Sequence, residues 1–253
     1  DFQKMSDKCT LFIDNRSEKY YELIIRNTIL SLDETWCHYV VAFPSNSDFM
    51  KSICDSISKE INLIILDIEE FDYAKYIDLL KNKDFWNKFN SEKLLLYEAD
   101  SYIFNGESIN KFLDVNYIGA PWQNDPHDLS VGNSGLSLFD VSTVKYILNK
   151  VNKEINIEEF SYLKNNASTP PKIPVDIFYA FFIRYFKLKE CTKDLAYQFS
   201  IENCYKKKYL NTIFGGHQFW NCLPEWDDFL TKNLDSKYSL NDNNGKKTQI
   251  QLL

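Results

Sequence analysis

The chain has 253 residues, enough for one large domain or two small ones, and 44% of them are hydrophobic and 16% aromatic. A substantial core is therefore expected, and global disorder is not. The formal net charge of −7 argues against a broad nucleic-acid-binding surface, and no run of about 18 apolar residues is present that could span a membrane.

The six cysteines are scattered and none forms a Cys-x-x-Cys pair, so the sequence signals neither a zinc site nor a thioredoxin-like site. We expect them to be buried thiols in a reducing compartment. The chain opens at Asp1 without an initiator methionine or a signal-peptide pattern. From this we expect one domain of a larger protein.

Apolar runs alternate with helical periodicities along the first hundred residues. Strands are expected at 9–14, 36–44, 61–66 and 94–97. Helices are expected between them at 17–32, 47–57, 73–80 and 85–89. This order predicts an α/β domain, Rossmann-like, with a mostly parallel central sheet and helices on both faces.

The second half of the chain is less regular. It contains an expected short helix at 108–113, a short strand at 117–122, polar loops at 123–135 and 163–173, and helices at 140–152 and 174–187. Residues 229–253 are polar and are expected to form a frayed tail. We expect a single domain over 1–228, with a nucleotide-binding half over about 1–104 and an acceptor half over about 105–228.

The strand expected at 94–97 ends in two acids, Glu98 and Asp100. In open α/β sheets, ligands bind at the carboxyl ends of the strands. Two carboxylates one residue apart at that edge suit a hard divalent cation, Mg²⁺ or Mn²⁺, which takes further ligands from water and substrate phosphates. The alternative is a strand that ends in acids and binds nothing.

Two polar strings also suit a ligand. Asp14 and Arg16 follow the first expected strand, where an arginine can make bidentate contact with phosphate and an acid can bind a ribose or a base. Asn133, Ser134 and Gly135 belong to a Gly-Asn-Ser-Gly string, which permits close approach of a ligand to the backbone and offers hydrogen bonds. The alternatives are a surface loop and a simple tight turn.

Asp176 and His217 can each be interpreted in two ways. Asp176 lies at the start of an expected apolar helix, where it either complements the helix dipole or serves as a catalytic carboxylate on a rigid element. His217 is one of three histidines. Flexible glycines before it could swing the imidazole toward a metal, with Trp220 closing the pocket. A lone histidine is more often structural.

Five strings, taken in order, resemble a family of GT-A type glycosyltransferases found in bacteria and giant viruses and long labelled a domain of unknown function. They are LLLYEADSYIF (94–104), NYIGAPW (116–122), VGNSGLSLF (131–139), PVDIFYA (174–180) and FGGHQFW (214–220). The resemblance covers roughly residues 9–225. Its most specific part is YIGAPW followed by GNSGLSL.

The resemblance implies a GT-A fold and the transfer of a sugar from a nucleotide-diphosphate sugar, with Mn²⁺ or Mg²⁺, to a hydroxyl of a glycan or other acceptor. A UDP-sugar donor and an inverting mechanism are expected. By position, the resemblance implies a metal site formed by Glu98, Asp100 and His217. It implies Asp176 as the acid that deprotonates the acceptor hydroxyl.

By the same resemblance, Asn133, Ser134 and Gly135 line the pocket for the donor sugar and the acceptor, and Asp14 and Arg16 hold the nucleotide. No nucleic-acid partner and no membrane span are expected. The expected location is cytoplasmic, in the host cytoplasm if the source is viral.

Two other functions stay open. A nucleotidyltransferase that makes activated sugars usually opens with a glycine-rich basic loop after the first strand, whereas the string at 14–17 has no glycine. The second is a non-catalytic nucleotide- or carbohydrate-binding module derived from a transferase. Val175 keeps it open, since related enzymes often have an acid there.

Overall fold

The computed structural model describes residues 6–223 with the exception of 59, 125, 126, 128, 130 and 167. The tail expected at 229–253 lies outside the described residues, as do parts of the two polar loops expected at 123–135 and 163–173.

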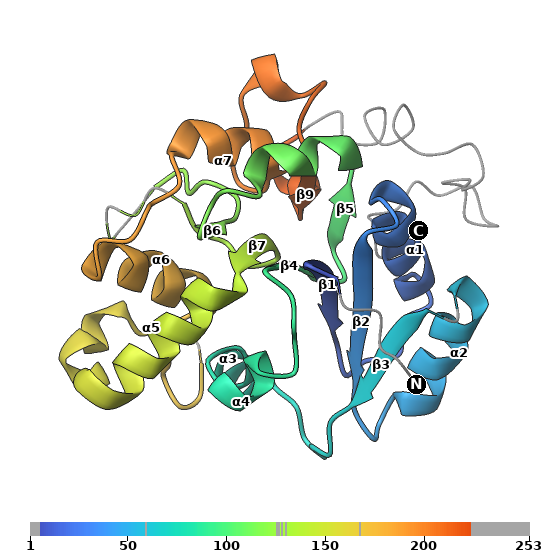
Figure 1. The fold of residues 1–253 in the computed structure, drawn as a ribbon, viewed down its shortest axis with the longest axis horizontal. Coiled ribbons are helices and arrows are strands. Elements are labelled where there is room, and N and C mark those ends of the chain that lie inside the picture. The colour runs from blue at the N-terminus through green and yellow to red at the C-terminus, as the bar shows by residue number, and fades with distance from the viewer. Residues whose placement is uncertain are drawn as a thin grey trace.

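The centre of the molecule is a sheet of six strands in the order β3-β2-β1-β4-β7-β6 (Figure 1). Its strands are β1 (Lys8–Ile13), β2 (Trp36–Ala42), β3 (Ile61–Ile65), β4 (Lys93–Tyr97), β6 (Tyr117–Ile118) and β7 (Leu136–Asp140). The first four pair in parallel, while β7 runs antiparallel to β4 and β6 antiparallel to β7. The prediction of a mostly parallel α/β sheet is confirmed.

Helices fill the connections between the strands. They are α1 (Tyr21–Ser31), α2 (Ser47–Ile57), α3 (Tyr73–Leu80), α4 (Lys83–Trp86), α5 (Val141–Glu154), α6 (Val175–Tyr185) and α7 (Lys193–Phe199). Short 3-10 helices span Gly106–Phe112, Ile157–Leu163, Lys207–Tyr209 and Phe219–Asn221. Figure 1 shows α1 and α2 together on one side of the strands and α3 and α4 on the other. The bounds of α2 and α3 agree with the prediction, whereas α1 begins four residues later than 17.

The apolar strand β4 lies in the middle of the core. Leu94, Leu95 and Leu96 are all fully buried, because the strand has a neighbour on each edge and is covered on both faces. The indole of Trp86 packs edge-on against Phe139 of β7 and donates a hydrogen bond to the Leu80 carbonyl. Phe139 is paired with Leu94, so this packing supports the start of β4.

A second, three-stranded sheet has the order β5-β9-β8, with β5 at Ser101–Ile103, β8 at Ser200–Ile201 and β9 at Gly215–His217. The expectation that flexible glycines swing His217 is wrong, since Gly215 and Gly216 are buried in β9. A Cβ at Gly216 would lie 2.9 Å from Phe219. Trp220 packs against Phe219 and is not among the residues that line the pockets described below.

Strand β7 was not predicted from the sequence, which suggested a loop up to residue 135 and a helix from residue 140. Leu136 and Leu138 are fully buried in it, and Asp140 ends it by accepting a hydrogen bond from the Thr143 amide as the N-cap of α5. An antiparallel strand of five residues directly after a glycine loop gives little periodicity to detect.

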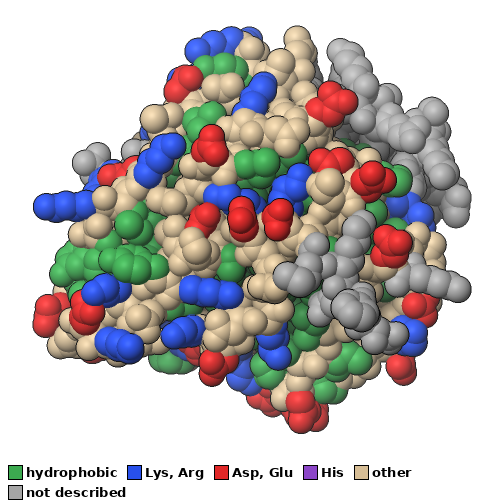
Figure 2. All heavy atoms as spheres, viewed as in Figure 1, with side chains coloured by type: hydrophobic (Ala, Val, Ile, Leu, Met, Phe, Trp, Pro, Cys, Tyr) green, Lys and Arg blue, Asp and Glu red, His purple; other side chains and the backbone are tan. Residues whose placement is uncertain are grey.

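The molecular surface has no single charge sign on the face shown in Figure 2, where acidic and basic side chains are interspersed. Within the described part of the chain, no helix is both long enough and apolar enough to traverse a bilayer.

Candidate active site

The two acids after β4 lie in a turn that is fixed to the Gly-Asn-Ser-Gly loop. The carbonyl of Gly135 accepts hydrogen bonds from the Glu98 amide at 2.7 Å and from the Ser101 hydroxyl at 2.6 Å. Ser101 then starts β5. The turn therefore holds Glu98 and Asp100 at the carboxyl end of the central strand, where ligands bind in α/β sheets.

His217 reaches these acids through the register of the small sheet, in which β5 and β9 are antiparallel and Ser101 is paired with His217. Its Nε2 lies 3.0 Å from Asp100 Oδ1 and 3.5 Å from Glu98 Oε2. One ligand atom from each of the three residues lies within 4.8 Å of the others. The structure thus brings together the three residues predicted as the metal site.

The surroundings of His217 fit a bound cation. The side chain is 5% exposed, and among the described residues neither ring nitrogen has a hydrogen bond of good geometry. A buried imidazole without such partners is unusual. Two carboxylates and one imidazole suit Mn²⁺, and they leave room for water and phosphate oxygens around the ion.

Electrostatics around the cluster agree with a site built for positive charge. Burial by itself would lower the pKa of His217, but Asp100, Glu202 and Glu98 around the ring raise it well above its usual value. Burial would raise the pKa of Asp100, yet contact with His217 holds it below the usual value. The carboxylate of Asp100 is therefore available as a charged ligand.

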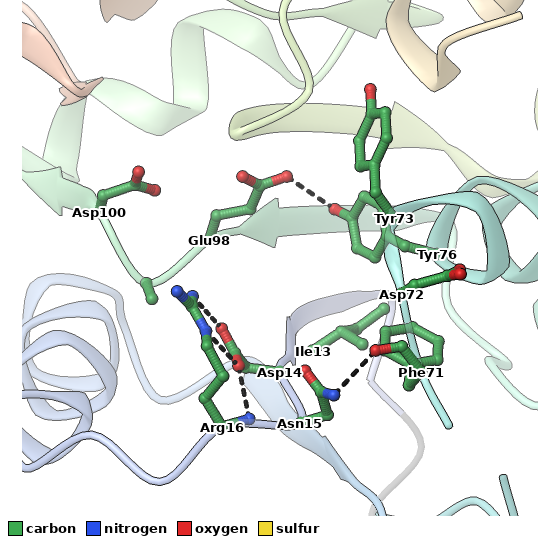
Figure 3. Close-up of a pocket in the computed structure, with 11 residues that line it drawn as sticks. Ile13, Asp14, Asn15, Arg16, Phe71, Asp72, Tyr73, Tyr76, Glu98 and Asp100 are labelled. Carbon is green, nitrogen blue, oxygen red and sulfur yellow. Dashed lines mark hydrogen bonds and ion pairs between the residues drawn. The ribbon is translucent and has the colours of Figure 1, made fainter. Parts of the chain in front are cut away.

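A first pocket of about 440 Å³ lies between the ends of β1 and β4, on one side of Glu98 (Figure 3). We call it the Arg16 pocket. It is lined by Ile13, Asp14, Asn15, Arg16, Phe71, Asp72, Tyr73, Tyr76, Glu98, Ala99 and Asp100.

Arg16 makes a bidentate pair with Asp14 in this pocket, from Nε to Oδ1 at 3.0 Å and from Nη2 to Oδ2 at 2.6 Å. Asp14 is 9% exposed and Arg16 is 59% exposed, so the arginine is the accessible partner. The sequence predicted an arginine aimed at phosphate. The structure shows that its guanidinium already holds the carboxylate of Asp14 and that both residues line the same pocket.

A second pocket of about 480 Å³ opens on the other side of Glu98, and we call it the Asp176 pocket. It shares Tyr73 and Glu98 with the Arg16 pocket. Its other lining residues are Trp122, His127, Asn133, Ser134, Gly135, Asn165, Pro174, Asp176, Ile177, Glu202, His217 and Gln218. The cluster of Glu98, Asp100 and His217 therefore stands between two pockets.

The glycines of the Gly-Asn-Ser-Gly loop allow close packing with the protein's own rings, where the sequence suggested close approach of a ligand. A Cβ at Gly132 would overlap Trp122, and one at Gly135 would overlap His217. Between them Asn133 has a φ of 46°, in the left-handed region, and its Oδ1 accepts from the Gly135 amide at 2.8 Å. The loop thus fixes two walls of the Asp176 pocket.

Asp176 lies in the first turn of α6, as the sequence predicted, and faces the pocket named after it. Burial raises the pKa of Asp176 to about 6, with a further increase from the nearby Glu202; amide hydrogen bonds from Ile177 and Asn133 partly oppose this. A carboxylate with a raised pKa in a pocket is a candidate general base.

Sequence reasoning missed four residues of the site: Tyr73, Tyr76, Glu202 and Gln218. The Tyr76 hydroxyl donates to Glu98 Oε1 at 2.9 Å, and Gln218 Nε2 donates to Asp100 Oδ2 at 2.8 Å. Glu202 is 7% exposed, accepts from Asn133 and lies 3.6 Å from His217 Nδ1. None of the four carried a local signal, because even Glu202 follows a strand of only two residues, β8.

The fold can be compared with those of solved structures. The chain is similar to three solved structures of glycosyltransferases with GT-A folds. The apo structure of the bifunctional glycosyltransferase WbbM matches with a TM-score of 0.55 at 10% identity, over 93% of this chain and 50% of that one. The galactosyltransferase LgtC, in complex with donor and acceptor sugar analogs, matches with a TM-score of 0.52 at 11% identity, over 85% and 87%.

The apo form of glycosyltransferase GlyE from Streptococcus pneumoniae TIGR4 matches with a TM-score of 0.50 at 10% identity, over 88% of this chain and 60% of that one. The chain thus spans about half of WbbM and three-fifths of GlyE. At these identities the similarity shows the fold alone, which is the GT-A type that the sequence predicted.

The chain belongs to the family described as "Protein of unknown function (DUF5672)", whose model matches residues 60–236. No curated protein matches the sequence. The predicted membership of a family once labelled as unknown agrees with this description, whereas glycosyl transfer by that family remains a prediction.

Proposed function

We propose that this protein is a metal-dependent glycosyltransferase that moves a sugar from a nucleotide-diphosphate sugar, with UDP as the favoured nucleotide, to an acceptor hydroxyl. The observation that carries the proposal is the cluster of Glu98, Asp100 and His217 between two pockets. A donor of this class has three parts, and the site offers one place for each: nucleotide, diphosphate and sugar.

The nucleotide fits the Arg16 pocket, where Asp14 and Arg16 lie after β1. Arg16 is the only Lys or Arg among the described residues that line either pocket, and its guanidinium is paired with Asp14. The chain's own side chains therefore offer little positive charge to a diphosphate. Mn²⁺ held by Glu98, Asp100 and His217 would supply that charge and stabilise the leaving diphosphate.

The sugar and the acceptor then share the Asp176 pocket. Asp176 accepts the proton of the acceptor hydroxyl as the oxygen attacks the anomeric carbon; the bond from that carbon to the diphosphate oxygen breaks, and the nucleoside diphosphate leaves. A direct displacement of this kind inverts the anomeric centre. Asn133, Ser134 and Gly135 shape the pocket wall beside the sugar.

The test is a screen for release of nucleoside diphosphate from UDP-, GDP- and dTDP-sugars with Mn²⁺, using the wild type and Asp176→Asn. The proposal predicts Mn²⁺-dependent release by the wild type. It also predicts donor binding without turnover by the variant, since the isosteric amide cannot take a proton. A wild type that binds a nucleotide but releases no product from any donor or acceptor would favour the non-catalytic module.

A further inference from the structure

The Asp176 pocket carries an excess of negative charge that the proposed reaction does not require. This inference rests on the proposed function. We propose that the pocket is selective for a transferred sugar that is neutral, and that it rejects sugars bearing a carboxylate or a phosphate.

Among the residues that the structure describes, three carboxylates line this pocket, those of Glu98, Asp176 and Glu202, and no lysine or arginine does. A dication bound to Glu98, Asp100 and His217 would balance the negative charges of Glu98 and Asp100. The donor diphosphate then adds its own negative charge. Asp176 and Glu202 then face the sugar, with no lysine or arginine among the described lining residues.

Two lysines outside the described lining, Lys81 and Lys172, have partners elsewhere. Lys81 interacts electrostatically with Asp176, yet its ammonium donates to the Ile173 carbonyl and it does not line the pocket. Lys172 is paired with Asp78 on α3. Neither provides a counter-charge for an anionic sugar.

Apart from the carboxylates and two histidines, the described lining is uncharged. Asn133, Ser134 and Asn165 present amide and hydroxyl groups, and Tyr73 and Trp122 present aromatic rings. Neutral polar groups and rings are suited to the hydroxyls and apolar faces of a hexose. The volume of about 480 Å³ lies in the range typical of small-ligand pockets.

An anionic sugar would lose its water shell beside two carboxylates. Glu202 is 7% exposed and is held by the Asn133 amide, so it cannot turn away into solvent. A negative ligand placed beside carboxylates is repelled, which weakens its binding. Specificity is the resulting difference in affinity between the neutral and the anionic sugar. We expect at least a tenfold preference.

The experiment measures by calorimetry, in saturating Mn²⁺, the affinities for UDP-glucose and UDP-glucuronate. At C6 of the sugar, the first has a hydroxymethyl group and the second a carboxylate. UDP-galactose and UDP-galacturonate form a second matched pair. The wild type is expected to bind the neutral member at least about tenfold more tightly in either pair. Glu202→Gln, which keeps an acceptor for Asn133 and removes one charge, is expected to reduce that ratio severalfold.

Glu154→Gln is the matched control, because Glu154 lies on the exposed end of α5 and pairs with Lys150. It should leave the ratio unchanged. Equal or tighter binding of the uronates by the wild type, or an unchanged ratio in Glu202→Gln, overturns the inference while the transferase proposal stands. Failure of UDP itself to bind with Mn²⁺ would instead overturn the proposed function, and this inference with it.

Discussion

The imidazole of His217 rests on Gly135, so closely that a Cβ at position 135 would come nearer to the ring than 3.0 Å, a separation that real Cβ atoms essentially never show. A loop and a strand more than 80 residues apart in the chain therefore determine together where this proposed metal ligand lies. Only glycine at position 135 leaves space for the His217 ring in the position where it meets Glu98 and Asp100.

Gly135→Ala is predicted to displace His217 and to weaken Mn²⁺ binding by at least about tenfold, in the range typical of changes around metal ligands. Mn²⁺ affinity measured by calorimetry checks this, with circular dichroism to confirm the fold. Gly132→Ala is the comparison, because Gly132 belongs to the same loop but its Cβ would overlap Trp122 instead of His217. That variant is expected to keep its Mn²⁺ affinity, and equal losses in both would point to a general collapse of the loop.

Tyr76→Phe is predicted to weaken Mn²⁺ binding by about 3- to 10-fold. The Tyr76 hydroxyl orients Glu98 through a 2.9 Å hydrogen bond, and a hydrogen bond contributes about 0.5–1.5 kcal/mol. Burial raises the pKa of Tyr76 well above its usual value, so the hydroxyl stays a donor at any working pH. Tyr179→Phe, which loses a hydrogen bond to the Leu80 carbonyl in the core, should lower stability and leave metal affinity intact.

The rate of transfer is predicted to rise with pH through an apparent pKa near 6. Burial raises the pKa of Asp176 from 3.8 to about 6, so the carboxylate is protonated, and useless as a base, below that pH. The measurement is kcat/KM for the acceptor between pH 5 and 8 at saturating Mn²⁺ and donor. A profile that is flat across this range would remove Asp176 from the role of base.

The same pKa shift makes a prediction about stability. The folded state prefers protonated Asp176, so the stability of the protein falls as pH rises from about 4 to about 6 and stays lower above it. Asp176→Asn should therefore be more stable than the wild type at pH 8, by about 1–3 kcal/mol at 1.36 kcal/mol per pKa unit. Urea unfolding at pH 8 checks the sign, and a destabilised variant would contradict it.

Arg16→Lys is predicted to weaken UDP binding by about 3- to 10-fold without changing Mn²⁺ affinity. A single ammonium cannot hold both oxygens of Asp14, so the wall of the Arg16 pocket loses its geometry. Arg26→Lys is the matched control, since Arg26 pairs with Glu22 along α1 and lines neither pocket. The prediction fails if both variants bind UDP alike.

The parallel half of the fold was predictable because its strands are continuous apolar runs and its helices are clearly delimited. Asp72 caps α3 through the Lys75 amide, for example, and α2 follows the break at Pro44. The small sheet was not predictable. Strands of two or three residues such as β8 and β9 have no period, and β9 is mostly glycine.

The candidate site likewise has a part that could be predicted from the sequence and a part that could not. Glu98 and Asp100 could be placed from the strand before them, because the carboxyl edge of a sheet is a local feature. The approach of His217 depends on its pairing with Ser101, more than 100 residues away, which no local pattern encodes. The engagement of Arg16 by Asp14, and the burial of Glu202 beside His217, likewise required the structure.

The central claim is that Glu98, Asp100 and His217 hold a metal that binds the donor diphosphate. The most direct measurement is a calorimetric titration with UDP, with and without Mn²⁺, of the wild type and Asp100→Asn. The account predicts that wild-type binding requires Mn²⁺ and that the variant loses it by at least about tenfold. Metal-independent binding of UDP that is equal in both proteins, or no binding of UDP, GDP or dTDP with any divalent cation, would contradict it.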